Sequence, residues 1–417
     1  MSRLSRARYE CFILRICFLF VGQFSLYEGF QDWNRGRADV HPQVAVLTLL
    51  IYGASLFVIA LALMPNTTLF KFRDFQLLPL ILATLVSVYV VTEIAYRGSY
   101  RTDVLAFSQY SAILTVRGLN PYVQNLTPAL SMFSVQPSDL TPLTSGNYLA
   151  TFQYPSLHFL IFLPFVLAGL KDMRWVLVIF ELCVLFLLYL KCPSNLRPML
   201  ILPLFAGSDL MINFTASSVS DMLWVLPLLL VAFNLDEKPL LSGLFYGVAC
   251  AIKQPPWLLA PFLIIYLIHA DATETYREKL RRIGKFMIPA GALFTLVNLP
   301  FAYGDVAGWF QNITTPIKSD LVILSQGPAV LSQVGLIHVG RTFYTILAFG
   351  VLIVLLTNYH LHFKKLRYVI WILPGVILWF SYRALTSYVI YWMPLMLASL
   401  VLWYKADGFG AGSGRRR

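Results

Sequence analysis

Residues 43–64 read QVAVLTLLIYGASLFVIALALM and residues 384–404 read ALTSYVIYWMPLMLASLVLWY, and neither stretch contains a charged side chain. Each stretch is long enough for a helix to cross the ~30 Å hydrocarbon core of a bilayer. A helix is also the element that satisfies its own backbone hydrogen bonds where no water is present. The two stretches therefore predict transmembrane helices.

The composition of the whole chain agrees with this interpretation. Of its 417 residues 58% are hydrophobic, 15% are aromatic and 12% are charged, and the mean hydropathy is +0.69. A soluble domain is about 25% charged, so this chain cannot coat a water-soluble globule. Fibrous, disordered and disulfide-scaffold classes are excluded for the same reason. The composition predicts an all-α, polytopic bundle of transmembrane helices.

Further apolar runs bring the expected number of spans to about 11–13. These runs cover residues 11–30, 76–92, 156–170, 175–190, 198–206, 222–233, 240–252, 257–270, 283–301, 342–357 and 368–382. The number of crossings between residues 171 and 236 stays open, because it depends on whether 198–215 crosses fully. Together the runs predict one integral membrane domain over residues 1–405, followed by a flexible basic tail over 406–417.

The net charge of +12 arises from 32 Lys and Arg against 20 Asp and Glu. The basic residues gather in short clusters between apolar runs: Arg3, Arg6 and Arg8; Lys71 and Arg73; Arg277, Lys279, Arg281, Arg282 and Lys285; Lys364, Lys365 and Arg367. Such clusters mark cytoplasmic loops, so the N-terminus is expected inside and the long loops 97–155 and 302–340 outside. Anionic membrane lipids are the second expected contact, and nothing indicates a nucleic-acid partner.

The first outer loop begins with a helix signal. Thr102 or Asp103 can cap a helix start, Gly118 is a fitting stop, and Pro121 prevents continuation. One face of this helix would carry Val104, Phe107, Ser111 and Leu114, with Tyr110 alongside. We therefore expect an amphipathic helix in the membrane interface. Asp103 is either its N-cap or a general base, and the two roles are compatible because a helix N-terminus favours the ionised carboxylate.

The turn after this helix reads Gly118-Leu119-Asn120-Pro121-Tyr122, and Phe152-Gln153-Tyr154-Pro155 precedes the next span. With Asp103, these segments resemble the GT-C class of membrane glycosyltransferases, and most closely its polyprenyl-phosphate-mannose-dependent mannosyltransferases. Further short segments over residues 70–400 share the resemblance, namely Ser220-Asp221 and the stretch with Gly243, Gly247, Lys253, Pro255 and Pro256. The chain departs from related enzymes in lacking an Asp-x-Asp or Glu-x-Asp pair at Asp103, which disfavours a metal-dependent pyrophosphate donor.

The resemblance implies a fold, a reaction and a location. It implies a GT-C-type bundle in the cell membrane that transfers a hexose, with mannose favoured, from a polyprenyl-phosphate donor to an extracytoplasmic lipid or glycan acceptor. Asp103 would be the general base of an inverting transfer, and no cofactor is implied. The chain has no GxxxxGK[ST] or GxGxxG phosphate loop, so a cytosolic nucleotide donor is not indicated.

Basic side chains are the candidates to hold the donor phosphate, and we select Lys253, Arg341 and Arg383. Each could instead be a residue that extends its charge to the membrane interface. The candidates for contact with substrate are Tyr122, Tyr154, Gln254, His338 and Asp221. For Asp221, a role as helix cap is the favoured alternative. The histidines form no metal-ligand constellation in the sequence.

Two other classes of protein stay open at this point. A transporter or lipid flippase should contain internal repeats and paired discontinuous helices, and the sequence contains neither. A non-catalytic subunit of a glycan-assembly complex could retain the same motifs without activity. An assay of sugar release from polyprenyl-phosphate-mannose separates the three hypotheses.

Overall fold

The computed structural model describes residues 42–64, 98–193, 213–271, 273–318 and 320–406, with Ile94, Arg197 and isolated positions between 12 and 27. The chain divides into two compact units. Unit 1 comprises 1–98, 181–216 and 403–417, and unit 2 comprises 99–180 and 217–402. The described residues are mostly helical and include no β-strand, only two isolated antiparallel bridges. The predicted all-α class is confirmed.

Four described helices are long and apolar enough to cross a membrane: Ala45–Leu63, Tyr276–Ala302, Arg341–Leu361 and Thr386–Ala406. The last of these contains a turn at Tyr391 and Trp392, which divides it into α23 (Thr386–Ile390) and α24 (Met393–Ala406). The first lies in unit 1 as α3 (Pro42–Leu63) and matches the predicted span 43–64. The predicted spans at 76–92 and 198–206, most of 11–30, the two basic clusters at 3–8 and 71–73 and the tail beyond Ala406 lie outside the described residues.

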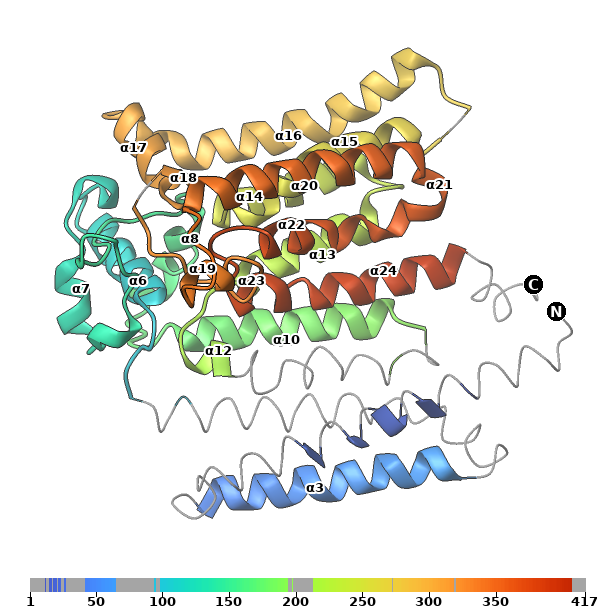
Figure 1. Cartoon of the computed structure of the whole chain (residues 1–417), viewed down its shortest axis with the longest axis horizontal. Helices are drawn as coiled ribbons and strands as arrows, with labels where there is room; N and C mark the ends of the chain where they lie inside the picture. The colour runs from blue at the N-terminus through green and yellow to red at the C-terminus, as the bar shows by residue number, and fades with distance from the viewer. Residues whose placement is uncertain are drawn as a thin grey trace, which may run out of the picture. The chain divides into compact units, whose positions relative to one another are not determined.

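Unit 2 contains a set of neighbouring helices that pack along their lengths (Figure 1). They are α13 (Met222–Asn234), α14 (Pro239–Ile252), η5 (Pro255–Leu259), α15 (Ala260–His269), α16 (Tyr276–Ala302), α20 (Arg341–Leu361) and α22 (Leu373–Trp379). Two glycines allow α14 to lie directly against α16. A Cβ at Gly243 would meet the carbonyl oxygen of Phe286 at 2.1 Å, and one at Gly247 would meet that of Ala290 at 2.7 Å. The Gly-x3-Gly spacing therefore serves helix packing.

The two outer loops form short helices at one end of α16 and α20, and α21 (Phe363–Leu366) lies at the other end (Figure 1). The first loop contains α6 (Asp103–Val116), η1 (Pro121–Val123), α7 (Thr127–Met132) and η2 (Pro137–Asp139), and it leads to α8 (Leu157–Leu160) and α9 (Leu163–Leu167). The second contains α17 (Val306–Ile313), α18 (Thr315–Lys318) and α19 (Val330–Gln333). The remaining elements are α10 (Arg174–Lys191), α12 (Asn213–Ala216), η6 (Arg367–Trp371), α23 (Thr386–Ile390) and α24 (Met393–Ala406).

The sequence predicted that the basic cluster at 277–285 lies in a loop. In the structure the cluster forms the first turns of α16. A capping box starts this helix early, because the Thr275 hydroxyl accepts from the backbone N–H of Glu278 while the Glu278 carboxylate accepts from that of Thr275. The cluster still lies toward the α21 end of unit 2, opposite the outer loops (Figure 1).

The helix α6 differs from the expected amphipathic helix. It has the predicted start and stop, since it begins at Asp103 and Gly118 follows its end with a left-handed φ of +75°. Nine of its residues are buried, however, and they occupy more than one face: Asp103, Leu105, Ala106, Phe107, Ser108, Gln109, Ser111, Ala112 and Leu114. The reason is that α7, α8 and α9 pack around it. A packed helix holds its first residue more firmly than an interfacial one.

The predicted orientation can be tested by labelling single cysteines in a cysteine-free chain. Ser145 and Arg277 are both exposed, Ser145 in the first outer loop and Arg277 in the basic turns of α16. We expect a membrane-impermeant maleimide to label Ser145→Cys in intact cells and Arg277→Cys only after permeabilisation. The reverse pattern would place the outer loops in the cytoplasm.

Candidate active site

A cavity of about 560 Å³ lies in unit 2 beneath the two outer loops. Six of the predicted site residues line it: Asp103, Tyr154, Asp221, Lys253, Gln254 and Arg383. Apolar side chains of α20 and α22 complete the wall, among them Phe349, Leu352 and Ile377. Its volume is in the range of ligand sites in proteins. The fold thus brings together polar residues that are up to 280 positions apart in the chain.

Asp103 is the first residue of α6 and its side chain is buried, with the residue 3% exposed. Its carboxylate accepts a hydrogen bond of 2.8 Å from the backbone N–H of Thr141. Thr102 occupies the N-cap position without a side-chain cap bond, because its hydroxyl donates to the carbonyl of Ser218 at 2.9 Å. Of the two predicted caps, Thr102 thus occupies the N-cap position without the expected side-chain bond, and the Asp103 carboxylate contacts the rest of the loop.

The surroundings of Asp103 change its acidity. Burial raises the pKa of the Asp103 carboxyl above its usual value, and the hydrogen bonds from Thr141 and the positive charge of Arg383 partly oppose this rise. Burial disfavours the charged carboxylate because water no longer solvates it. A carboxylate with a raised pKa is a stronger base once it is ionised, which suits proton abstraction.

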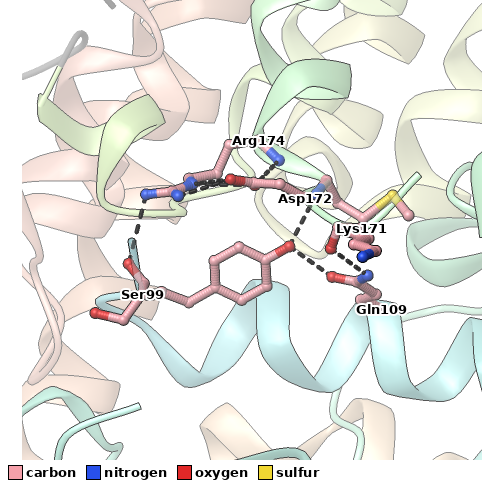
Figure 2. A network of polar contacts seen from close by, with 7 residues as sticks. Ser99, Gln109, Lys171, Asp172 and Arg174 are labelled. Atoms are coloured by element: carbon pink, nitrogen blue, oxygen red, sulfur yellow. Dashed lines mark hydrogen bonds and ion pairs between the residues drawn. The ribbon is translucent and has the colours of Figure 1, made fainter. Parts of the chain in front are cut away.

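A network of buried polar groups fixes α6 at its side (Figure 2). The Tyr100 hydroxyl donates to the side-chain oxygen of Gln109 at 2.5 Å and accepts from the backbone N–H of Met173 at 2.8 Å. The Gln109 amide donates in turn to the carbonyl of Lys171 at 2.9 Å. These bonds join α6 to the turn that precedes α10.

Arg174 holds the segment just before α6 (Figure 2). Its buried guanidinium forms a two-pronged ion pair with Asp172, with a shortest distance of 2.6 Å, and it donates to the carbonyl of Ser99 at 3.4 Å. The same guanidinium lies 5.5 Å from the centre of the Tyr100 ring. Sequence reasoning missed Tyr100, Gln109 and Arg174, since no motif links them and their contacts join distant segments.

Lys253 and Asp221 form a buried ion pair with an N–O distance of 2.8 Å. The second oxygen of the Asp221 carboxylate accepts from the indole N–H of Trp224 at 2.8 Å. The ammonium also lies 5.1 Å and 5.8 Å from the ring centres of Tyr154 and Tyr388. Asp221 occupies the N-cap position of α13, as predicted, but its side chain makes no cap bond and pairs with Lys253 and Trp224 instead. The charge of Lys253 is compensated inside the protein.

Arg383, unlike Lys253, forms no ion pair with a carboxylate in the described part of the chain. It lines the cavity, and its nitrogen Nη1 is buried without a hydrogen-bond partner among the described residues. A buried donor without a partner costs about 1–3 kcal/mol, and a charged group costs more. Such a donor is ready for an anionic ligand, because a ligand oxygen would supply the missing acceptor.

The third predicted cation and one predicted substrate contact do not line the cavity. Arg341 is the first residue of α20 and pairs with the carboxylate of Asp320. His338 is exposed on the second outer loop. Neither residue therefore contributes a side chain to the wall of the cavity.

Tyr122 does not line the cavity either. It is buried in the turn of the first loop, and its hydroxyl donates to the carbonyl of Tyr154 at 2.5 Å. The amide of Asn120 donates to the carbonyl of Phe301, and that of Asn312 donates to the carbonyl of Tyr122, at 2.9 Å and 3.0 Å. The turn therefore joins the first outer loop to the end of α16 and to α17.

Gln254 lines the cavity but uses its amide group within the protein. The nitrogen Nε2 donates to the carbonyl of Gln153 at 2.6 Å and to that of Ile313 at 2.9 Å. Both N–H groups of the side chain are thus occupied. Gln254 holds the segment before α8, the end of α14 and the end of α17 around the cavity.

Comparison of the chain with family models, with curated proteins and with solved structures gave no match. The chemistry available to the cavity follows therefore from its own side chains. These are the buried carboxylate of Asp103, the guanidinium of Arg383 with its unpaired donor, the Lys253–Asp221 ion pair, the exposed side chain of Arg101, the half-buried Asp139, and apolar walls.

Proposed function

We propose that this chain is a membrane glycosyltransferase of the GT-C type. It transfers a hexose, with mannose favoured by the sequence resemblance, from a polyprenyl-phosphate donor to a lipid or glycan acceptor. The bundle crosses the cell membrane many times, and its cavity is reached from the extracytoplasmic side. The observation that carries this proposal is the presence of the buried Asp103 carboxylate and the unpaired Arg383 donor in one cavity.

The proposed reaction needs one base and one anion-binding group. The carboxylate of Asp103 accepts the proton of an acceptor hydroxyl while that oxygen attacks the anomeric carbon. The bond between this carbon and the phosphate oxygen breaks, the electron pair of that bond stays on the phosphate oxygen, and polyprenyl phosphate leaves. Attack opposite the departing phosphate inverts the anomeric configuration. Arg383 donates hydrogen bonds to the phosphate oxygens and stabilises the charge that develops there.

The cavity has the charge and the walls that such a donor requires. A sugar linked to a lipid through one phosphate carries a single negative charge. The guanidinium of Arg383 supplies a positive charge with an unpaired buried donor, and the exposed Arg101, which also lines the cavity, supplies another. The charge of Lys253 is already neutralised by Asp221. The apolar side chains on α20 and α22 suit the lipid part of the donor.

Substitution of Arg383 tests the proposed binding of phosphate. Arg383→Ala is expected to weaken donor binding by about 10- to 100-fold, the usual range for loss of a charge-assisted hydrogen bond. Arg383→Lys should lose less, because it keeps the charge but not the planar fork. Affinity is measured with purified protein and polyprenyl-phosphate-mannose in detergent.

Arg117→Ala is the matched control, since Arg117 is exposed and does not line the cavity. It should bind the donor as the wild type does. If Arg383→Ala bound the donor as tightly as the wild type while Arg341→Ala bound it more weakly, we would assign the binding of phosphate to the second outer loop instead. Donor binding without any sugar release by the wild type would instead favour the flippase or the non-catalytic subunit.

The rate of transfer should depend on pH through Asp103. The base works only when ionised, so turnover should fall about tenfold per pH unit below the pKa of this carboxyl. Because burial raises the pKa of Asp103, this acidic limb should begin at a higher pH than for an ordinary aspartate. Single-turnover rates across a pH series measure it. A flat profile down to the usual pKa of aspartate would contradict the assignment.

A further inference from the structure

Residues 320–326 of the second outer loop run in an extended course that we name the strap. One edge of the strap pairs with the first outer loop. Leu321 forms an antiparallel bridge with Leu143, the N–H of Thr144 donates to the carbonyl of Asp320 at 2.8 Å, and that of Val322 donates to the carbonyl of Pro142 at 3.3 Å. Pro142 follows directly after Thr141, whose N–H binds the Asp103 carboxylate.

The other edge of the strap pairs with the segment that carries Arg383. The N–H of Leu324 donates to the carbonyl of Tyr382 at 3.2 Å, and that of Gln326 donates to the carbonyl of Ala384 at 2.9 Å. These two carbonyls belong to the residues on either side of Arg383. The strap is therefore hydrogen-bonded both to the segment that binds the Asp103 carboxylate and to the segment that contains Arg383.

Both ends of the strap are fixed. The carboxylate of Asp320 pairs with Arg341 at the start of α20. At the other end, a Cβ on Gly327 would meet the carbonyl oxygen of Trp379 at 1.8 Å, so only glycine permits this approach. The indole N–H of Trp379 donates to the carbonyl of Gln326 at 3.2 Å.

We propose that the strap is a positioning element that sets where Asp103 lies relative to Arg383. This inference rests on the proposed function for its catalytic meaning, since it concerns the spacing between the base and the group that holds the phosphate. The strap acts through the backbone of its two neighbours. Arg341, which is expected from the sequence to hold phosphate, instead anchors the strap through Asp320. A misplacement of about 1 Å between reacting groups can lower a rate on the order of 100-fold.

The coupling is tested first by hydrogen exchange, which requires no enzymatic activity. Gly327→Ala forces the strap away from Trp379, because a backbone carbonyl cannot yield as a flexible side chain can. We expect amide exchange to become about tenfold faster in the strap and also at 141–144, on the order of the loss of one hydrogen bond. Gly340→Ala is the matched control in the same loop, since a Cβ there meets nothing within 4 Å, and its exchange should equal that of the wild type.

A second variant releases one edge of the strap alone and keeps the test valid if Gly327→Ala does not fold. Val322→Pro removes the N–H that donates to Pro142 and leaves the bonds to Tyr382 and Ala384 in place. Exchange should rise at 141–144 and not around 383. Faster exchange in the strap with unchanged exchange at 141–144, in either variant, would show that the strap does not hold the Asp103 segment and would overturn the inference.

Kinetics then separate the strap from the proposed reaction. In an active enzyme, Gly327→Ala should lower kcat about 10- to 100-fold and move the acidic limb of the pH profile, because the hydrogen bond to Asp103 is loosened. In the Asp103→Asn background, the same change should lower kcat by a smaller factor, because only the effect through Arg383 remains. Equal losses in both backgrounds would overturn the positioning role. Absence of transfer in the wild type would refute the proposed function, while the exchange experiment would still decide the coupling.

Discussion

The Asp103→Asn variant is expected to transfer sugar about 10²–10⁴-fold more slowly than the wild type, the usual contribution of a positioned general base. Asparagine has nearly the same size and keeps an oxygen that can accept from the N–H of Thr141, so α6 should keep its place. It cannot take a proton from the acceptor. Turnover is measured with polyprenyl-phosphate-mannose at saturating acceptor, beside donor affinity and thermal unfolding.

Asp305→Asn provides the matched control. Asp305 caps α17, where its exposed carboxylate accepts from the N–H of Gly308 at 2.8 Å. The same chemical change at this cap should leave turnover unaltered, since asparagine is an equally good N-cap. Donor affinity should survive in Asp103→Asn, because Arg383 still holds the phosphate. Near-normal turnover in a well-folded Asp103→Asn enzyme would refute the base and the mechanism built on it.

Lys253→Met is expected to lower the free energy of unfolding by about 3–5 kcal/mol. The change leaves the buried carboxylate of Asp221 without its ammonium partner, and an unpaired buried charge is far more costly than a missing pair. Methionine has a similar shape, so loss of packing adds little. Unfolding is followed by denaturant titration in detergent, which reports the free energy directly.

The double variant Lys253→Met/Asp221→Asn isolates the cause. It removes both charges and keeps an oxygen for the indole N–H of Trp224, so most of the lost stability should return. Its donor affinity should match that of the wild type, because the pair is not the proposed phosphate ligand. If Lys253→Met were as stable as the wild type and bound the donor more weakly, Lys253 would be a phosphate ligand after all.

Local sequence predicted the bounds of several described helices closely, while the predicted spans 156–170 and 368–382 are each divided into two short helices. The apolar run 240–252 is α14 (Pro239–Ile252), and 222–233 is α13 (Met222–Asn234), because hydrophobicity is a property of the segment itself. The start of α16 was missed, since the capping box and basic turns extend this helix beyond its apolar part. The burial of α6 was missed because it depends on α7, α8 and α9, which the pattern of α6 cannot reveal.

The candidate site was predicted in part for the same physical reason. Asp103 stands out in the sequence, as a carboxylate at a helix start beside a recognisable turn. The ranking of Lys253, Arg341 and Arg383 could not be predicted, because it depends on which of them meets a carboxylate. Asp221 and Asp320 neutralise the first two through contacts formed only by the fold. Charge alone therefore says little about which cation stays available to a ligand.

The junction formed by Asn120, Tyr122 and Asn312 has a consequence for how such chains are found by motif searches. All three side chains donate to backbone carbonyls, which any residue type provides, so the junction requires nothing from a sugar or a lipid. In a chain that contains the Gly-x-Asn-Pro-Tyr turn, we expect the first outer loop to pack against the end of a long span, whichever substrate the protein binds. Searches that use this turn are expected to find proteins with the same loop architecture. The combination of Asp103 and Arg383 would distinguish those among them that share the proposed chemistry.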